Sequence, residues 1–165
     1  MAATITPILD HQEILIKIDR IACEICEKHT AGGQLIICGM NSRGFDIAGR
    51  IRLKMQDVLP ELKIQLLQVD TTQSEIPEFL PKISFEGQQV LVVDDVINTG
   101  RTLMSVLQRI FNENPTNIET AFLAKREHRN YPVKADYVGI SLATTLQEHV
   151  VYDNSDNSAL KVYLN

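Results

Sequence analysis

The N-terminal part of the chain has the hydrophobic periodicity of an amphipathic helix. Four isoleucines recur at spacings of four, three and four residues, which places them on one helix face: Ile14, Ile18, Ile21 and Ile25. Asp10 with Glu13 three residues later is a capping-box pattern, which is typical of a helix start. The pattern therefore predicts a helix that begins after Asp10 and ends near His29, before two glycines.

Short apolar runs alternate with further helical patterns through the rest of the chain. The expected strands lie at residues 34–38, 62–69, 90–95, 117–124, 135–142, 149–153 and 160–165. The other expected helices lie at residues 45–59 and 100–111. Because strands alternate with helices, we expect an α/β fold with a central, mostly parallel sheet and helices on both of its faces.

One long segment lacks a clear period. Residues 70–87 contain two prolines, and a loop of this length within a compact domain is usually functional or mobile. The chain of 165 residues shows no internal repeat, low-complexity segment or linker. We therefore expect a single domain over residues 1–165.

Composition narrows the class of protein. Hydrophobic residues make up 44% and charged residues 22%, which is typical of a globular protein, and no apolar run approaches a membrane span. The N-terminal residues lack the features of a signal peptide, so we expect a cytoplasmic protein.

Cys23 and Cys26 form a C-x-x-C pattern inside the first helix, with no second pair to complete a zinc site. We interpret them as ordinary thiols. The net charge of −5 argues against broad, nonspecific nucleic-acid binding but leaves room for a local basic patch.

The segment VLVVDDVINTG, residues 90–100, carries the strongest chemical pattern. In parallel sheets, ligands bind beyond the carboxyl ends of the strands, where Asp94 and Asp95 are expected. The turn that follows supplies backbone N–H groups and the start of a helix, which together bind phosphate. The two carboxylates beside this phosphate site could accept hydrogen bonds from neighbouring hydroxyls. A ligand with a phosphate next to a diol is a ribose 5-phosphate. The alternatives are a metal or phospho-acceptor site for the acid pair, and ordinary capping for the turn.

A family resemblance can be named on these residues. LVVDDVINTGRTL resembles the phosphoribosyl-pyrophosphate (PRPP) motif of type I phosphoribosyltransferases. ILDHQEILIKIDRIACEICE, GMNSRGFDIAGRI and LAKREHRNYPVKADYVG resemble the PyrR group, the pyrimidine-operon regulators that also carry uracil phosphoribosyltransferase activity. The resemblance implies the type I phosphoribosyltransferase fold, with a flexible loop at residues 70–87 and a small hood over the base.

The resemblance also implies roles for individual residues. Asp94 and Asp95 would hold the ribose hydroxyls and, with Arg43, act in catalysis. The 5-phosphate would be bound by Val96, Ile97, Asn98, Thr99, Gly100, Arg101 and Thr102. The pyrophosphate would be bound by a loop made of Asn41, Ser42, Arg43 and Gly44. Lys125 and Arg126 would contact the base, with the lysine on a keto oxygen. The alternative for Arg43 is a solvated loop arginine, and for Lys125 and Arg126 a charged strand end.

The reaction of the family displaces pyrophosphate from the ribose C1 by a nitrogen of a base. Mg²⁺ is the expected cofactor, because negative charge builds on the leaving pyrophosphate. The 70–87 loop would close and exclude water. This loop departs from the family pattern, since Lys82 is its one basic residue and it contains no arginine. The departure leaves the efficiency of turnover open, while PRPP binding is expected to be intact.

Two main hypotheses follow. The first is a Mg²⁺-dependent phosphoribosyltransferase of nucleotide salvage that acts on uracil or a 6-oxopurine. The alternative is a PyrR-like RNA-binding regulator that senses PRPP or nucleotides, with a silent homologue as a third reading. A basic face for RNA would combine residues 125–134 with Lys17, Arg20 and Lys28 of the first helix. Asp19 and Cys23 on that helix argue against it. Besides these ligands, we expect a homo-dimer or higher homo-oligomer and no membrane partner.

Overall fold

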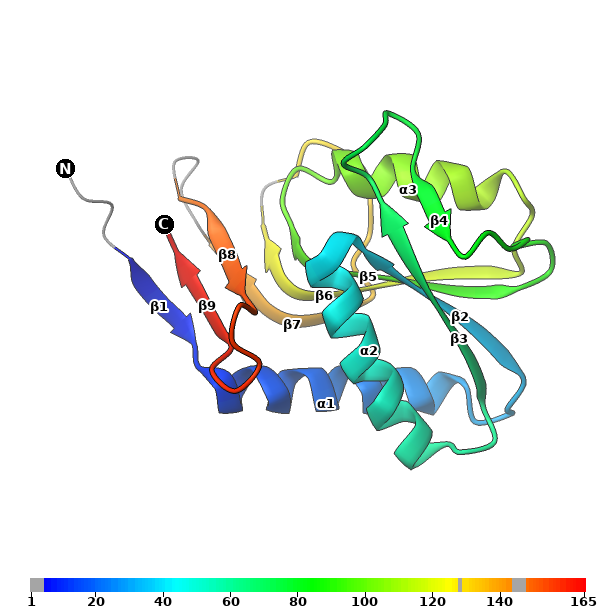
Figure 1. Ribbon diagram of the computed structural model, residues 1–165, viewed down its shortest axis with the longest axis horizontal. Coiled ribbons are helices and arrows are strands. Elements are labelled where there is room, and N and C mark those ends of the chain that lie inside the picture. Colours follow the sequence, from blue (N-terminus) through cyan, green and yellow to red (C-terminus); the bar gives the residue numbers. More distant parts are fainter. Residues whose placement is uncertain (1–4, 128, 144–147) are drawn as a thin grey trace.

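A six-stranded sheet forms the centre of the computed structural model, which describes residues 5–127, 129–143 and 148–165. The strand order is β4-β3-β2-β5-β6-β7 (Figure 1). The five parallel strands are β2 (Gln34–Met40), β3 (Lys63–Asp70), β5 (Gln89–Ile97), β6 (Asn117–Arg126) and β7 (Tyr137–Leu142). The short edge strand β4 (Glu78–Leu80) is antiparallel to β3. The expected mostly parallel sheet is therefore confirmed.

Helices cover both faces of this sheet (Figure 1). Helices α1 (His11–Lys28) and α2 (Asn41–Val58) pack on one face, and α3 (Arg101–Phe111) packs on the other. Side chains along β5 point alternately to the two faces of the sheet. Leu91 and Val93 pack in the core under α1 and α2, whereas Val90 and Val92 pack in the core under α3. The expected α/β fold is confirmed.

The start of α1 has the geometry that its sequence predicts. The Asp10 carboxylate accepts a hydrogen bond from the backbone N–H of Glu13 at 2.9 Å, and the Glu13 carboxylate accepts one from the N–H of Asp10 at 2.9 Å. All four isoleucines of the predicted face are buried. The predicted end near His29 is also correct, since His29 is the C-cap residue.

A second, smaller sheet lies beside the first (Figure 1). It has the order β1-β9-β8 and consists of β1 (Thr6–Leu9), β9 (Lys161–Leu164) and β8 (Val150–Asp153). Tyr152 anchors it to α2, because its buried hydroxyl donates a hydrogen bond to the Asp46 carboxylate at 2.7 Å. We identify this sheet with the expected hood, whose contact with a base remains a prediction.

Several element boundaries differ from the prediction. Helix α2 begins at Asn41 instead of residue 45, so the expected loop at 41–44 is the first helical turn. Strand β5 continues two residues beyond Asp95, to Ile97. Strand β6 continues to residue 126, two residues beyond its expected end at residue 124. Strands β1 and β4 were not predicted.

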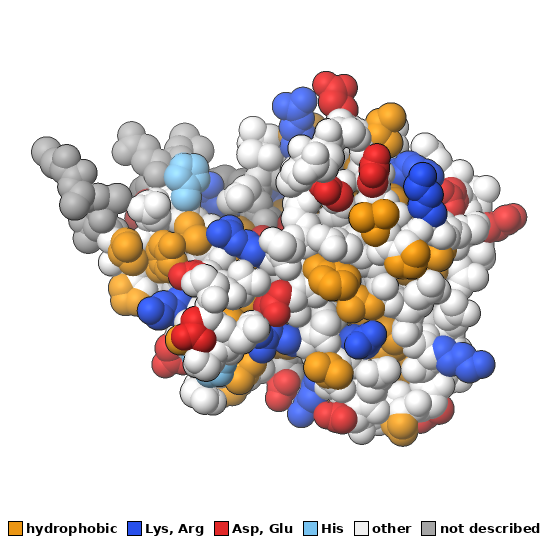
Figure 2. Space-filling model, in the orientation of Figure 1, with side chains coloured by type: hydrophobic (Ala, Val, Ile, Leu, Met, Phe, Trp, Pro, Cys, Tyr) orange, Lys and Arg blue, Asp and Glu red, His pale blue; other side chains and the backbone are white. Residues whose placement is uncertain are grey.

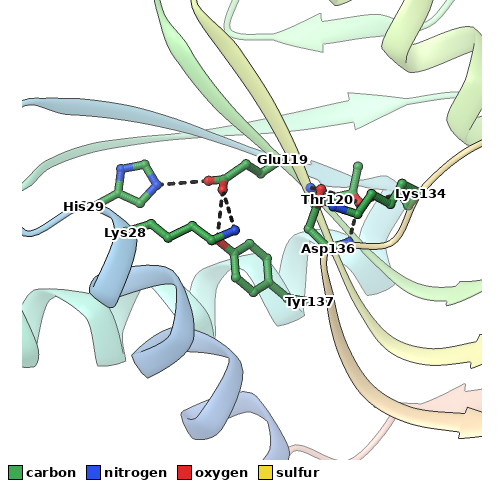
Figure 3. A network of polar contacts seen from close by, with 7 residues as sticks. All are labelled: Lys28, His29, Glu119, Thr120, Lys134, Asp136 and Tyr137. Carbon is green, nitrogen blue, oxygen red and sulfur yellow. Dashed lines mark hydrogen bonds and ion pairs between the residues drawn. The ribbon is translucent and has the colours of Figure 1, made fainter.

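A buried polar network joins α1 to the amino ends of β6 and β7 (Figure 3). The Glu119 carboxylate lies 3.1 Å from His29 Nε2 and 3.3 Å from Lys28 Nζ, and it accepts a hydrogen bond from the Tyr137 hydroxyl at 2.9 Å. The Lys28 ammonium also lies 4.7 Å from the centre of the Tyr137 ring. Burial is the larger cause of the raised pKa of Tyr137, and the hydrogen bond to Glu119 raises that pKa further. The Tyr137 hydroxyl therefore keeps its proton and remains a donor.

Two further expectations concern composition. The three cysteines are free, with Cys23 exposed and Cys26 and Cys38 buried, and their interpretation as ordinary thiols remains a prediction. Among the described residues, no helix is both long enough and apolar enough to cross a membrane.

Candidate active site

A cavity of about 520 Å³ lies at the carboxyl edge of the sheet, between the first turns of α2 and α3. It gathers most of the residues predicted for PRPP from two distant segments: Asn41, Ser42, Arg43, Asp94, Asp95, Val96, Ile97, Asn98, Thr99, Gly100, Arg101 and Thr102. Four further lining residues were not predicted: Met40, Thr71, Leu103 and Phe122. The predicted residues Gly44, Lys125 and Arg126 do not line it. The sequence therefore predicted the position of the cavity, but it did not predict all of the residues that line it.

The acid pair lies within β5, just before its end. Asp94 and Asp95 are both partly buried, and each carboxylate accepts the backbone N–H of the following residue, at 2.9 Å and 2.8 Å. Burial raises the pKa of Asp94 well above its ordinary value, and the neighbouring charge of Asp95 raises it further. A hydroxyl donor or a cation at this carboxylate would favour its ionised form.

The turn after β5 opens directly into α3. Gly100 has a φ of 84°, and a Cβ there would lie 2.6 Å from Val133 Cγ2, so only glycine suits the position. The backbone N–H groups of Asn130 and Tyr131 donate to the Thr99 carbonyl at 3.1 Å and 3.2 Å, which supports the turn from outside. Among the described side chains, none caps α3, and its first turn contains no acid. This N-terminus is suited to an anion.

The first turn of α2 forms the opposite wall of the cavity. A Cβ on Gly44 would lie 2.7 Å from the Val93 carbonyl oxygen and 3.0 Å from Asp94 Oδ1, so the helix start and β5 approach closely because residue 44 is glycine. This turn also contains no acidic residue. Gly44 therefore shapes the cavity without lining it, and brings a second helix N-terminus beside the acid pair.

Arg43 lies between the two walls. Its guanidinium NH1 is 3.9 Å from Asp95 Oδ2, and its side chain is 50% exposed. At this distance and exposure the ion pair contributes little to stability. The guanidinium is therefore available to an anionic ligand at the start of α2.

Lys125 and Arg126 end β6 at the same edge of the sheet. Lys125 lies in register with Ile97 of β5 and Ser141 of β7, and both basic residues are partly buried. Their position is compatible with contact to a ligand that extends from the cavity. Their role toward a base remains a prediction.

The 70–87 segment is only partly irregular. Its middle forms β4, and Phe79 and Phe85 pack edge to face, with ring centres 4.9 Å apart, against the core under α3. Lys82 lines a separate hollow with Arg109 and Glu113 instead of the cavity. From this segment only Thr71 lines the cavity.

The chain matches a family model described as "Phosphoribosyl transferase domain" over residues 4–153. It is 38% identical to a Bifunctional protein PyrR of Elusimicrobium minutum over an alignment of 171 positions, which covers 94% of this chain and 96% of that protein. It is 35% identical to a Bifunctional protein pyrR of Enterococcus faecalis, with 81% of each chain covered.

Solved structures with the same fold have lower sequence identity. The hypoxanthine phosphoribosyltransferase of Trypanosoma cruzi superposes with a TM-score of 0.76 at 20% identity and covers 95% of each chain. A hypoxanthine-guanine phosphoribosyltransferase from Bacillus anthracis superposes with a TM-score of 0.72 at 19% identity, covering 85% of this chain and 84% of that one. At such identities the likeness shows the fold alone.

Proposed function

The chain belongs to the phosphoribosyl transferase domain family, with relatives in the PyrR group, and on that premise we propose that it transfers the ribose 5-phosphate of PRPP to a nucleobase. The base would be uracil or a 6-oxopurine, and pyrophosphate would be released. The observation that carries this proposal is one cavity with two acid-free helix N-termini and an acid pair between them. PRPP has the matching order of groups: a phosphate, a diol and a pyrophosphate.

Each wall of the cavity would hold one part of PRPP. The N–H groups at the start of α3 would bind the 5-phosphate, and the first turn of α2 with Arg43 would bind the pyrophosphate. The carboxylates of Asp94 and Asp95 would accept hydrogen bonds from the ribose hydroxyls. Donors at Asp94 would offset the burial that raises its pKa. The ribose C1 would then be held in position for attack by the base.

Mg²⁺ is the proposed cofactor. The described residues contain no cluster of three or more His, Cys, Asp or Glu side chains able to hold a metal alone. Mg²⁺ often binds through one or two carboxylates together with substrate phosphates and water, and Asp94 and Asp95 fit that mode. When bound, the ion would neutralise charge on the leaving pyrophosphate.

We expect Lys125→Ala to weaken base or nucleotide affinity more than PRPP affinity. Loss of a donor to a keto oxygen costs about 1–3 kcal/mol, which is roughly 5- to 150-fold in affinity. Calorimetry with PRPP, and with uracil, hypoxanthine and guanine nucleotides, measures both effects. Lys134→Ala is the control, because Lys134 follows the same strand but its side chain is 83% exposed and pairs with Asp136. Equal losses for both ligands, or none, would remove Lys125 from the base site.

The alternative function is RNA binding, and it is favoured by the resemblance to the PyrR group. Several contacts weigh against it. Arg20 pairs with Glu24 and donates to the carbonyl oxygens of Val138 and Gly139, and Lys28 pairs with Glu119. On the face shown in Figure 2, Lys and Arg side chains are interspersed with Asp and Glu among the coloured residues. RNA binding of this kind draws much of its strength from clustered cations.

The deciding assay compares both functions on one preparation. We expect nucleotide formation from PRPP, Mg²⁺ and at least one of uracil, hypoxanthine and guanine. RNA binding, measured at physiological salt, is expected to be weak and without sequence preference. Tight, sequence-selective RNA binding without a nucleotide product from any base would overturn the proposal in favour of the regulator.

A further inference from the structure

The side chain of Asn41 reaches across the cavity edge to the 70–87 segment. Its Oδ1 accepts hydrogen bonds from the backbone N–H of Thr71 at 3.0 Å and from the Thr71 hydroxyl at 3.1 Å. Its Nδ2 lies 2.9 Å from the Thr71 hydroxyl oxygen, which accepts from it. Three contacts thus join the first residue of α2 to the first residue after β3. Both residues line the cavity.

The backbone at Asn41 is held in an uncommon conformation. Its φ is 51°, in the left-handed region that asparagine tolerates better than most residues other than glycine. The ladder between β2 and β3 ends with the pair Met40 and Val69, so the Asn41 contact continues the connection beyond the sheet. The Asn41 side chain therefore connects two segments of the chain at the point where both leave the carboxyl edge of the sheet.

The two ends of the 71–87 segment, which we call the arm, are fixed in different ways. At its C-terminal end, the Phe85 N–H donates to Glu113 at 3.0 Å, and the Gly87 N–H donates to the Asn114 carbonyl at 3.0 Å. The two acceptor residues, Glu113 and Asn114, lie just after α3 in the chain. At its N-terminal end, Asp70 accepts from the N–H and hydroxyl of Thr72, both at 2.7 Å, which shapes a local turn. The contact across to α2 is the one made by Asn41.

We propose that Asn41 is a positioning residue that sets where the arm leaves the sheet, and that it does not itself bind the pyrophosphate. This inference rests on the proposed function and revises the role expected for Asn41 within it. The backbone N–H groups of the α2 turn and Arg43 hold the anion, while the Asn41 amide couples that turn to Thr71. The direction in which residues 72–76 leave the edge of the sheet follows from that coupling.

The test uses three variants of the full chain. Asn41→Gly removes the amide and tolerates the positive φ. Thr71→Val removes the hydroxyl at nearly constant shape, and Thr71→Ser retains it. A glutamate-specific protease reports the exposure of the arm through cleavage after Glu75, with cleavage after the exposed Glu61 as the internal standard. Calorimetry with Mg²⁺ and inorganic pyrophosphate reports anion binding, and steady-state kinetics separates kcat from KM.

We expect Asn41→Gly to raise cleavage after Glu75 by roughly fivefold or more, the size expected when hydrogen bonds that hold a segment are lost. Thr71→Val should raise it in the same direction, and Thr71→Ser should restore the wild-type rate. In both faster-cleaved variants kcat should fall by a larger factor than the affinity for pyrophosphate.

Two results would overturn the proposal. One is unchanged cleavage after Glu75 in Asn41→Gly. The other is a loss of pyrophosphate affinity in that variant that exceeds its loss of kcat, which would make Asn41 a ligand of the anion. Failure of the wild-type protein to bind either PRPP or pyrophosphate would sink the proposed function instead, and the cleavage rates would still decide whether Asn41 positions the arm.

Discussion

Replacing Asp94 and Asp95 together by asparagine is expected to weaken PRPP binding by roughly 100-fold or more and to leave the protein folded. A hydrogen bond to a charged group contributes about 1.5–3 kcal/mol, and two carboxylates lose that charge together. The variant also removes the oxygen charges that a Mg²⁺ ion would contact. Calorimetric titration with PRPP and Mg²⁺ measures the loss.

Asp57→Asn is the matched control for this experiment. It removes a negative charge from an exposed position on α2 and should leave PRPP affinity unchanged. If the double variant binds PRPP as tightly as the wild-type protein, the ligand does not lie at the acid pair.

The single variant Asp94→Asn is expected to increase the free energy of unfolding of the ligand-free protein at neutral pH. The pKa of Asp94 is raised in the folded state, so the folded protein holds the proton at pH values where the unfolded chain has lost it. The wild-type protein therefore loses stability as the pH rises from the unfolded pKa through the raised one, and the amide does not titrate. Urea unfolding from acid to neutral pH measures the difference, which should grow with pH.

Replacing Glu119 by alanine is expected to lower the free energy of unfolding by about 2–6 kcal/mol, because two buried groups each lose their hydrogen-bond partner at a cost of about 1–3 kcal/mol. The change leaves the buried His29 ring and the Tyr137 hydroxyl without their shared acceptor (Figure 3). Glu119→Gln should cost less, because its amide oxygen can still accept from Tyr137. Chemical denaturation of both variants measures the two losses.

A surface ion pair supplies the comparison for Glu119. Glu24 pairs with Arg20 four residues earlier on α1, and both side chains are at least 40% exposed. Glu24→Ala should therefore cost less than about 1 kcal/mol. Should Glu119→Ala cost no more than Glu24→Ala, the network would not contribute to stability as we infer.

The sequence predicted the elements whose signals are local. The isoleucine spacing and the capping box identified α1, and the apolar run before Asp94 identified β5. Strand β4 escaped prediction because it has three residues, lies close to Pro77 and Pro81, and exists only through pairing with β3. The first turn of α2 was expected as a loop, because Asn41 and Gly44 disfavour a helix in isolation. The close approach of Gly44 to β5 is a tertiary contact that no local pattern contains.

The site was predictable to a similar extent. The acid pair and the turn after it are contiguous, so their motif could be recognised. Thr71 follows β3 at the carboxyl edge, and the rule that placed Asp94 there could have identified it too. Phe122 offered no such signal, since it reads as an ordinary strand residue. Glu119 also lies in a predicted strand, but its partner His29 is distant in the chain and only the fold brings them together.

The smaller sheet has a consequence for the order in which the molecule can assemble during synthesis. Its central strand, β9, follows every other described element in the chain, and it joins β1 to β8, which do not pair with each other. All residues that line the cavity, in contrast, lie between Met40 and Phe122. Because chains emerge from the ribosome N-terminus first, the pocket for the phosphates can form while β1 still waits for its partner. The smaller sheet would then be completed after the pocket has formed.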